Sequence, residues 1–91
     1  MHERSLMVSL MAQIEAIARV HQAQRVIRVD VTLGPLAHIS PAHFREHFQE
    51  ASRGTICEGA ELVIQEATDP TDPHAQEILL TSIEIEEIEP A

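Results

Sequence analysis

The sequence predicts an α+β domain in which two helices pack on one face of a three-stranded mixed β-sheet. Three observations support this prediction. Apolar residues recur at helical spacing near the N-terminus, they alternate with a period of two in the middle of the chain, and two more strand-like stretches lie in the second half. One layer of helices on one sheet is an economical way to bury these apolar faces. We therefore expect residues 1–91 to form a single domain.

The first element is predicted to be an amphipathic helix from Ser5 to about His21. Its apolar positions follow helical spacing, and polar residues occupy the opposite face. The apolar positions are Leu6, Met7, Leu10, Met11, Ile14, Ile17, Ala18 and Val20. Because the helix begins so close to the N-terminus, it fixes where the first three residues can point.

A half-buried strand is predicted from Arg25 to Leu33, since apolar and polar residues alternate along it. Its inward positions are Ile27, Val29, Val31 and Leu33. Gly34 and Pro35 end the strand.

A second, shorter helix is predicted after Ser40, which is a good N-cap residue and is followed by Pro41 at the first helical position. Phe44, Phe48 and Ala51 form the expected buried stripe. Gly54 is a suitable C-terminal stop.

The rest of the chain is predicted to form two strands joined by a loop. The first strand covers 60–66 with Leu62 and Ile64 inward, and the loop covers 67–77, where two prolines prevent regular pairing. The last strand covers 78–88, with Ile83 and Ile85 on one face and a bulge or strand end before Ile88. Its glutamates would protect an exposed sheet edge from pairing.

Composition narrows the class of function. Fifteen acidic residues against six arginines give a formal net charge of −9, which disfavours nucleic acid and anionic membrane as partners. An acidic surface suits a basic protein or a cation, or simply keeps the protein soluble. With 2% aromatic residues the core is too small for a deep substrate pocket, and we expect no enzyme activity. A single cysteine, no signal-peptide pattern and no membrane-length apolar run predict a cytoplasmic protein.

The N-terminal Met1-His2-Glu3 is the strongest candidate site. A histidine at position 2 can bring its imidazole, its backbone nitrogen and the free α-amine to one metal ion. Deprotonated amide nitrogens favour the square-planar geometry that Ni(II) and Cu(II) accept. We therefore predict Met1, His2 and Glu3 as a nickel site.

The remaining histidines and the cysteine are weaker candidates. His43 and His47 lie one helical turn apart, which puts two imidazoles on one face, but two ligands make an incomplete site and we expect surface histidines. His21 would complement the dipole at the end of the first helix, and His74 lies in the loop. Cys57 is expected to be a buried small apolar residue.

Taken together, these segments resemble the HypA/HybF family, nickel-delivery proteins of [NiFe]-hydrogenase maturation. The resemblance covers residues 1–66 and 83–89. It rests on Met1-His2-Glu3 with Ser5-Leu6, on 29–34, on Phe44 and Phe48, on Arg53-Gly54-Thr55, on 58–62 with Ile64, and on Ile85 and Ile88-Glu89. It implies Ni(II) as the bound ion, and a maturation GTPase and the hydrogenase large subunit as partners.

Two departures from the family pattern stand out. Family members carry a zinc domain with two CxxC pairs between the last two strands, whereas here the short loop 67–77 takes its place and no CxxC occurs. We therefore expect no structural zinc. Some relatives have an acidic residue near the nickel just before the second helix. The equivalent position here is Ser40, and His38 two residues earlier is a candidate substitute, although a loop histidine is more often solvated.

The leading hypothesis is a nickel-binding metallochaperone-like accessory protein, as a monomer or a homodimer paired through its last strand. The alternative is a zinc-less paralogue that acts as a metal-free interaction or regulatory module. A weaker third hypothesis is a subunit that assists another nickel enzyme such as urease.

Overall fold

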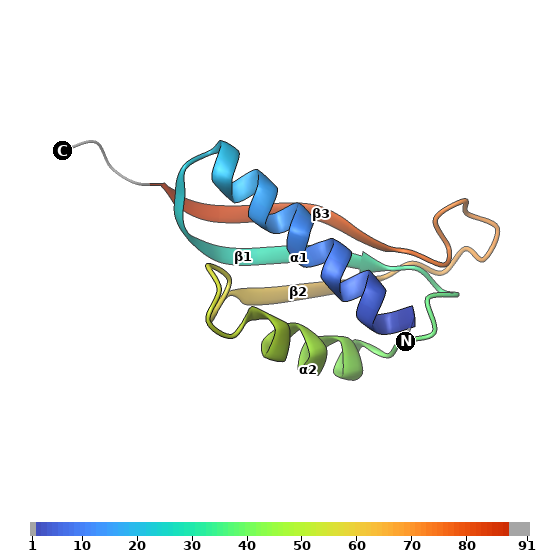
Figure 1. The fold of residues 1–91 in the computed structure, drawn as a ribbon. Helices are drawn as coiled ribbons and strands as arrows, with labels where there is room; N and C mark the ends of the chain where they lie inside the picture. Colours follow the sequence, from blue (N-terminus) through green and yellow to red (C-terminus); the bar gives the residue numbers. More distant parts are fainter. Residues whose placement is uncertain (1, 88–91) are drawn as a thin grey trace.

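The computed structural model describes residues 2–87, with side chains from Ser5 onward. The elements are α1 (His2–Val20), β1 (Ala23–Leu33), α2 (Pro41–Ser52), β2 (Glu61–Glu66) and β3 (Ile78–Glu87). The strands form one sheet in the order β2-β1-β3, with β1 parallel to β2 and antiparallel to β3 (Figure 1). Both helices join the β1 side chains Val29, Val31 and Leu33 in one core. The predicted α+β class, with two helices and a mixed sheet of three strands, is confirmed.

Helix α1 starts earlier than predicted, at His2 and not at Ser5. Its buried side chains are Met7, Leu10, Met11, Ile14 and Ala18. Two predicted core positions are wrong, because Ile17 is 36% exposed and Val20 is 79% exposed. At 3.6 residues per turn, Val20 lies roughly 120° around the helix from Ile14, away from the stripe that faces the sheet. The helical spacing of the apolar residues was predicted correctly, but the predicted buried stripe of α1 was too wide.

Strand β1 buries Val26, not the predicted Ile27, which is only half-buried. The cause is an irregularity in the pairing with β3, where the register shifts between Val26 and Arg28. An extra residue at such a point reverses which face the following side chains occupy. Beyond the shift, Val29, Val31 and Leu33 point inward as predicted.

Helix α2 has the predicted ends. Ser40 is extended, and its Oγ accepts a hydrogen bond from the backbone N–H of His43 at 3.1 Å. Pro41 occupies the first turn, and Gly54 has the positive φ of +75° that suits the residue after a helix. Phe44 and Phe48 are buried and stack with their ring centroids 6.5 Å apart.

The two outer strands flank β1 on opposite sides. In β2, Leu62 is buried and Ile64 is partly buried, as predicted. In β3, Ile83 and Ile85 pack partly against the core, whereas the glutamates of this edge strand are exposed. Ile88, where the sequence suggested a bulge or strand end, lies outside the described residues.

The segment 67–77 is irregular, as predicted, and it is pinned to the turn that follows β1. The N–H of Gly34 donates to the carbonyl of Glu77 at 2.9 Å, and the N–H of Leu36 donates to the carbonyl of Ala75 at 2.7 Å. Ala75 is buried. The segment also contains a local turn, in which the Asp69 carboxylate accepts a hydrogen bond from the N–H of Thr71 at 2.9 Å.

Candidate metal centre

The predicted ligands sit at the start of α1. Met1 lies outside the described residues, and the side chains of His2 and Glu3 are likewise undescribed, so the ligand set stays a prediction. The backbone of His2 and Glu3 forms the beginning of the helix. The first four N–H groups of any helix have no carbonyl partner within it. Their amide nitrogens are therefore not committed to the helical hydrogen-bond ladder.

The start of α1 lies near the start of α2 and the connection that leads into it (Figure 1). In this connection His38 is exposed and has a positive φ of 60°. The hydroxyl of Ser40, the position at which the family resemblance led us to look for an acidic residue, caps α2. Ser40 thus has a structural role here.

The two histidines of α2 are exposed, as predicted. The ring centroids of His43 and His47 are 6.3 Å apart and the ring planes meet at 72°. His21 is exposed just beyond the end of α1, and His74 contacts the Glu77 carboxylate, which raises the pKa of its imidazole. Among the side chains that the structure describes, those of residues 5–87, no group of three or more His, Cys, Asp and Glu is placed to enclose a metal ion.

Cys57 is fully buried in the connection between α2 and β2, which confirms the prediction of a small core residue. Burial raises the pKa of its thiol, because the interior disfavours the thiolate. A thiol that stays protonated is a poor nucleophile and a poor metal ligand.

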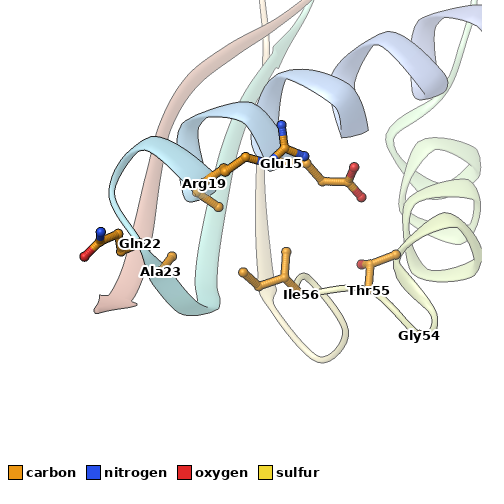
Figure 2. Close-up of a pocket in the computed structure, with 8 residues that line it drawn as sticks. Glu15, Arg19, Gln22, Ala23, Gly54, Thr55 and Ile56 are labelled. Atoms are coloured by element: carbon orange, nitrogen blue, oxygen red, sulfur yellow. The ribbon is translucent and has the colours of Figure 1, made fainter. Parts of the chain in front are cut away.

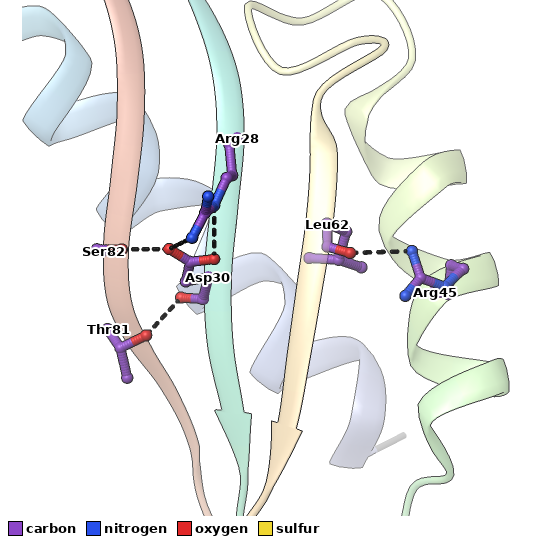
Figure 3. Close-up of polar contacts among 6 residues, drawn as sticks. All are labelled: Arg28, Asp30, Arg45, Leu62, Thr81 and Ser82. Atoms are coloured by element: carbon purple, nitrogen blue, oxygen red, sulfur yellow. Dashed lines mark hydrogen bonds and ion pairs between the residues drawn. The ribbon is translucent and has the colours of Figure 1, made fainter.

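Asp30 on the central strand is also committed to protein contacts (Figure 3). Its carboxylate accepts from Nε of Arg28 at 3.0 Å and from the hydroxyl of Ser82 on β3. These hydrogen bonds lower the pKa of Asp30. At the β2 edge of the sheet, Nη1 of Arg45 donates to the carbonyl of Leu62 at 3.1 Å, and this hydrogen bond ties α2 to β2.

An open cavity of about 780 Å³ lies at the far end of α1 from the N-terminal motif. Glu15 and Arg19 of α1 stand on one side of it, and Thr55 and Ile56 of the α2–β2 connection stand on the other (Figure 2). No cluster of metal-ligand side chains lines it. The cavity is therefore not part of the candidate metal centre.

Comparison with solved structures places this architecture in a known class. The solution structure of the Ni metallochaperone HypA from Helicobacter pylori superimposes with a TM-score of 0.80 at 22% identity, over 97% of this chain and 100% of that one. A second solution structure, of a HypA protein, gives a TM-score of 0.71 at 24% identity, over 93% of this chain and 96% of that one. By fold, the protein is a two-helix, mixed-sheet domain of the kind found in these two HypA structures.

Sequence comparison gives the family. Residues 1–71 match the family model described as HypA, hydrogenase/urease nickel incorporation, metallochaperone. The hydrogenase maturation factor HypA of Chlorobium limicola is 46% identical over 66 residues, which are 72% of this chain and 57% of the relative. The factor of the same name from Desulfitobacterium hafniense strain DCB-2 is 38% identical over 65 residues, 71% of this chain and 57% of the relative. The chain belongs to the HypA family, and the matches span somewhat more than half the length of these relatives.

The family assignment confirms the resemblance predicted from the N-terminal motif and from residues 58–62. None of the helices in the described part of the chain is long and apolar enough to cross a membrane.

Proposed function

We propose that the protein is a nickel-binding metallochaperone-like accessory protein for the maturation of [NiFe]-hydrogenase. In this proposal it coordinates Ni(II) at Met1, His2 and Glu3 and passes the ion to a partner. The observation that carries the proposal is the Met1-His2-Glu3 start, because the HypA family model matches this chain from its first residue. By resemblance, the partners are a maturation GTPase and the hydrogenase large subunit.

The chemistry follows from the donors at a helix start. The α-amine of Met1, the backbone nitrogens of His2 and Glu3 and the His2 imidazole are four nitrogen donors within three residues. Four nitrogens in a plane suit Ni(II), and deprotonated amides strengthen that preference. The helical ladder does not use these N–H groups, so binding breaks none of its hydrogen bonds. In this proposal the ion is held at the end of the chain, so its release to an acceptor requires no buried cage to open.

We further propose that the loop 67–77 stands in place of the family's zinc domain and that the protein holds no structural zinc. The sequence contains one cysteine and no CxxC pair. Closed zinc sites are built from four Cys or His ligands, with thiolates predominating in the family pattern. Metal analysis of protein purified without chelators should find less than about 0.1 zinc per chain tightly held after gel filtration.

The test of nickel binding is a calorimetric Ni(II) titration on tag-free protein that starts with Met1, run beside His2→Ala and His21→Ala. His21 is exposed at the opposite end of α1, so its variant is a matched control. We expect one equivalent bound with square-planar absorption in the wild type and in His21→Ala, and loss of both signals in His2→Ala. Equal binding by the two variants would refute the N-terminal site.

The alternative is a metal-free interaction or regulatory module. It is favoured by the missing CxxC pairs and by Ser40, whose hydroxyl caps α2 in place of an acidic side chain near the metal. A protein that bound no nickel in the titration, yet formed a complex with the maturation GTPase, would support this alternative.

A further inference from the structure

We propose that the outer edge of β3 is a docking surface for a basic, extended segment of a partner protein, which joins the sheet as a fourth strand. The surface consists of residues 82–87 of β3 and of Ile17 and Val20 near the end of α1, and we call it the β3 edge. Addition of a strand to an open sheet edge takes its affinity from backbone hydrogen bonds and its specificity from alternate side chains. The proposal does not depend on nickel binding at the N-terminus.

The two edges of the sheet are not alike. At the β2 edge, α2 lies beside the strand and Nη1 of Arg45 donates to the carbonyl of Leu62 (Figure 3). At the other edge, Figure 3 shows no element of residues 2–87 in line with the sheet beyond β3. Within the described part of the chain, no backbone hydrogen bond joins residues 79–87 to a segment outside the sheet. The N–H and C=O groups on the outer side of β3 are therefore open to another strand.

The segment 82–87 is regular enough to pair with a further strand. The pairing of β1 with β3 shifts register at three points, and at two of them the extra residue, Gln24 or Ile27, belongs to β1. The extra residue of β3 is Thr81, which precedes the segment. Residues 82–87 therefore run without a bulge over about the length of a typical strand.

The last turns of α1 extend past β3 on the core side of the sheet. Figures 1 and 3 both show α1 crossing the sheet diagonally, from the β2 side at its start to beyond β3 at its end. Ala23, three residues after Val20, pairs with Glu87, so the end of α1 lies at the same end of the sheet as residues 82–87. The sheet of three strands is thus narrower than the helix that covers it.

Ile17 and Val20 lie on the flank of α1 that faces away from α2. Glu15 lines one cavity with Ala51 of α2 and another with Thr55 of the connection after it, so Glu15 marks the α2 flank of the helix. At 3.6 residues per turn, Ile17 and Val20 lie roughly 160° and 140° around the helix from Glu15. Both side chains are exposed. A strand beside β3 would lie next to them, and its core-facing side chains would cover this apolar surface.

The side chains of β3 define the pattern that a partner strand must have. Ile83 and Ile85 pack partly against the core. Glu84 and Glu86 alternate with them, so their exposed side chains project from the opposite face of the sheet. Cross-strand pairs of opposite charge stabilise a sheet. A fourth strand therefore needs apolar residues on its core-facing side and basic residues on the side that lies next to these glutamates.

Glu84 is the carboxylate best placed to bind a basic partner. Glu86 already contacts Nη2 of Arg25 at 3.5 Å, but Glu84 forms no ion pair with another described side chain. Arg28, which pairs with Glu84 across the strands, donates two hydrogen bonds of 3.0 and 3.2 Å to the carboxylate of Asp30. The net charge of −9 also attracts a basic segment at longer range. A second copy of the chain would bring the same glutamates, so we assign the β3 edge to a basic partner and not to self-pairing.

The probe is a capped heptapeptide in which lysine and valine alternate, Lys-Val-Lys-Val-Lys-Val-Lys. A control peptide, Lys-Lys-Val-Val-Val-Lys-Lys, has the same composition and charge but no alternation. Each peptide is titrated into the 91-residue protein at low ionic strength. Shifts of the backbone amide NMR signals give the affinity, and hydrogen exchange gives the protection of residues 82–87. Sedimentation of the protein without peptide gives its oligomeric state.

Two pairs of variants separate the β3 edge from the rest of the surface. Glu84→Gln removes a carboxylate at this edge, and Glu61→Gln is its matched control, because Arg28 pairs with Glu84 on one side and with Glu61 on the other. Val20→Ser removes exposed apolar surface at the end of α1, and Val8→Ser is its matched control on the α2 flank of the same helix. All four side chains are exposed, so the variants should keep the fold.

We expect the alternating peptide to bind at one site, to protect amides within residues 82–87, and to bind at least about fivefold more tightly than the control peptide. Its affinity should fall about two- to fivefold in Glu84→Gln and in Val20→Ser, and less than about twofold in Glu61→Gln and Val8→Ser.

Three results would overturn the proposal. Equal binding of the two peptides, or no binding of either, would show that the edge does not select an alternating strand. Equal losses within either pair of variants would show that binding is not located at the β3 edge. A dimer whose residues 82–87 are already protected without peptide would show that a second copy fills the edge.

Discussion

Replacing Gly34 by alanine is predicted to be one of the most destabilising single-methyl additions in this protein. A Cβ at position 34 would lie 2.2 Å from the carbonyl oxygen of Ala75 and 2.8 Å from that of His74. These neighbours are backbone atoms that cannot rotate away, so the segment 67–77 has to move. Inserting a methyl group into such a packed contact costs about 1–3 kcal/mol.

Movement of the segment also weakens two hydrogen bonds, from the N–H of Gly34 to Glu77 and from the N–H of Leu36 to Ala75. Each contributes about 1 kcal/mol, so the total loss in the free energy of unfolding is roughly 2–4 kcal/mol. For a domain of this size, that loss lowers Tm by roughly 10–30 °C. Thermal unfolding followed by circular dichroism measures the shift, and hydrogen exchange at Leu36 should become faster.

Gly59→Ala is the matched control. A Cβ at Gly59 meets no atom within 4 Å, but its φ of +80° disfavours alanine. The conformational cost there is about 1–2 kcal/mol. Gly34 has no positive φ, so its predicted cost is steric alone. The reasoning is refuted if Gly34→Ala lowers Tm no more than Gly59→Ala and leaves exchange at Leu36 unchanged.

Two further perturbations test the local chemistry. Ser40→Ala should lower the free energy of unfolding by about 1 kcal/mol, because the N–H of His43 loses its cap, and Ser40→Asp should restore most of it. Chemical denaturation of the three proteins measures this, and equal stability of Ser40→Ala and wild type would contradict it. Asp30→Asn should destabilise the protein at neutral pH. Since hydrogen bonds to Arg28 and Ser82 depress the pKa of Asp30 below 3.8, the wild-type advantage is present above that pH and is lost as pH falls through the folded-state pKa. An advantage that persisted unchanged to pH 2 would rule out this origin.

Local patterns predicted the elements well but not how they meet. The cap and first turn of α2 could be predicted because Ser40 and Pro41 act on their own backbone. The burial of Val26 in place of Ile27 could not be predicted, because the shift in register arises from pairing with β3, more than fifty residues later in the chain. Val20 fits the helical spacing closely enough to be predicted as buried, but it is exposed. The position of the sheet decides which side of α1 is covered, and the sequence of the helix does not contain that position.

For the candidate metal centre, too, some features can be predicted from the sequence and others depend on the tertiary structure. Met1-His2-Glu3 is a contiguous set of donors, so sequence alone can suggest it. His43 and His47 are also visible in the sequence as a pair one turn apart. That Ala51 of the same helix lines a cavity together with Met7 and Met11 of α1 is a tertiary property. No periodicity within α2 encodes that arrangement.

The pairing of Leu33 with both Glu66 and Ile78 has a consequence for how such a domain can change over generations. The chain leaves the sheet on one side of β1 and returns on the other, at the same level. The two exit points are therefore only about 10 Å apart, which is twice the spacing of neighbouring strands. Residues 68–74 between them are exposed and contribute nothing to the core. Each doubling of such a connection costs only about 0.6 kcal/mol. Segments of very different length can therefore replace this connection between β2 and β3 while the sheet and its core stay the same.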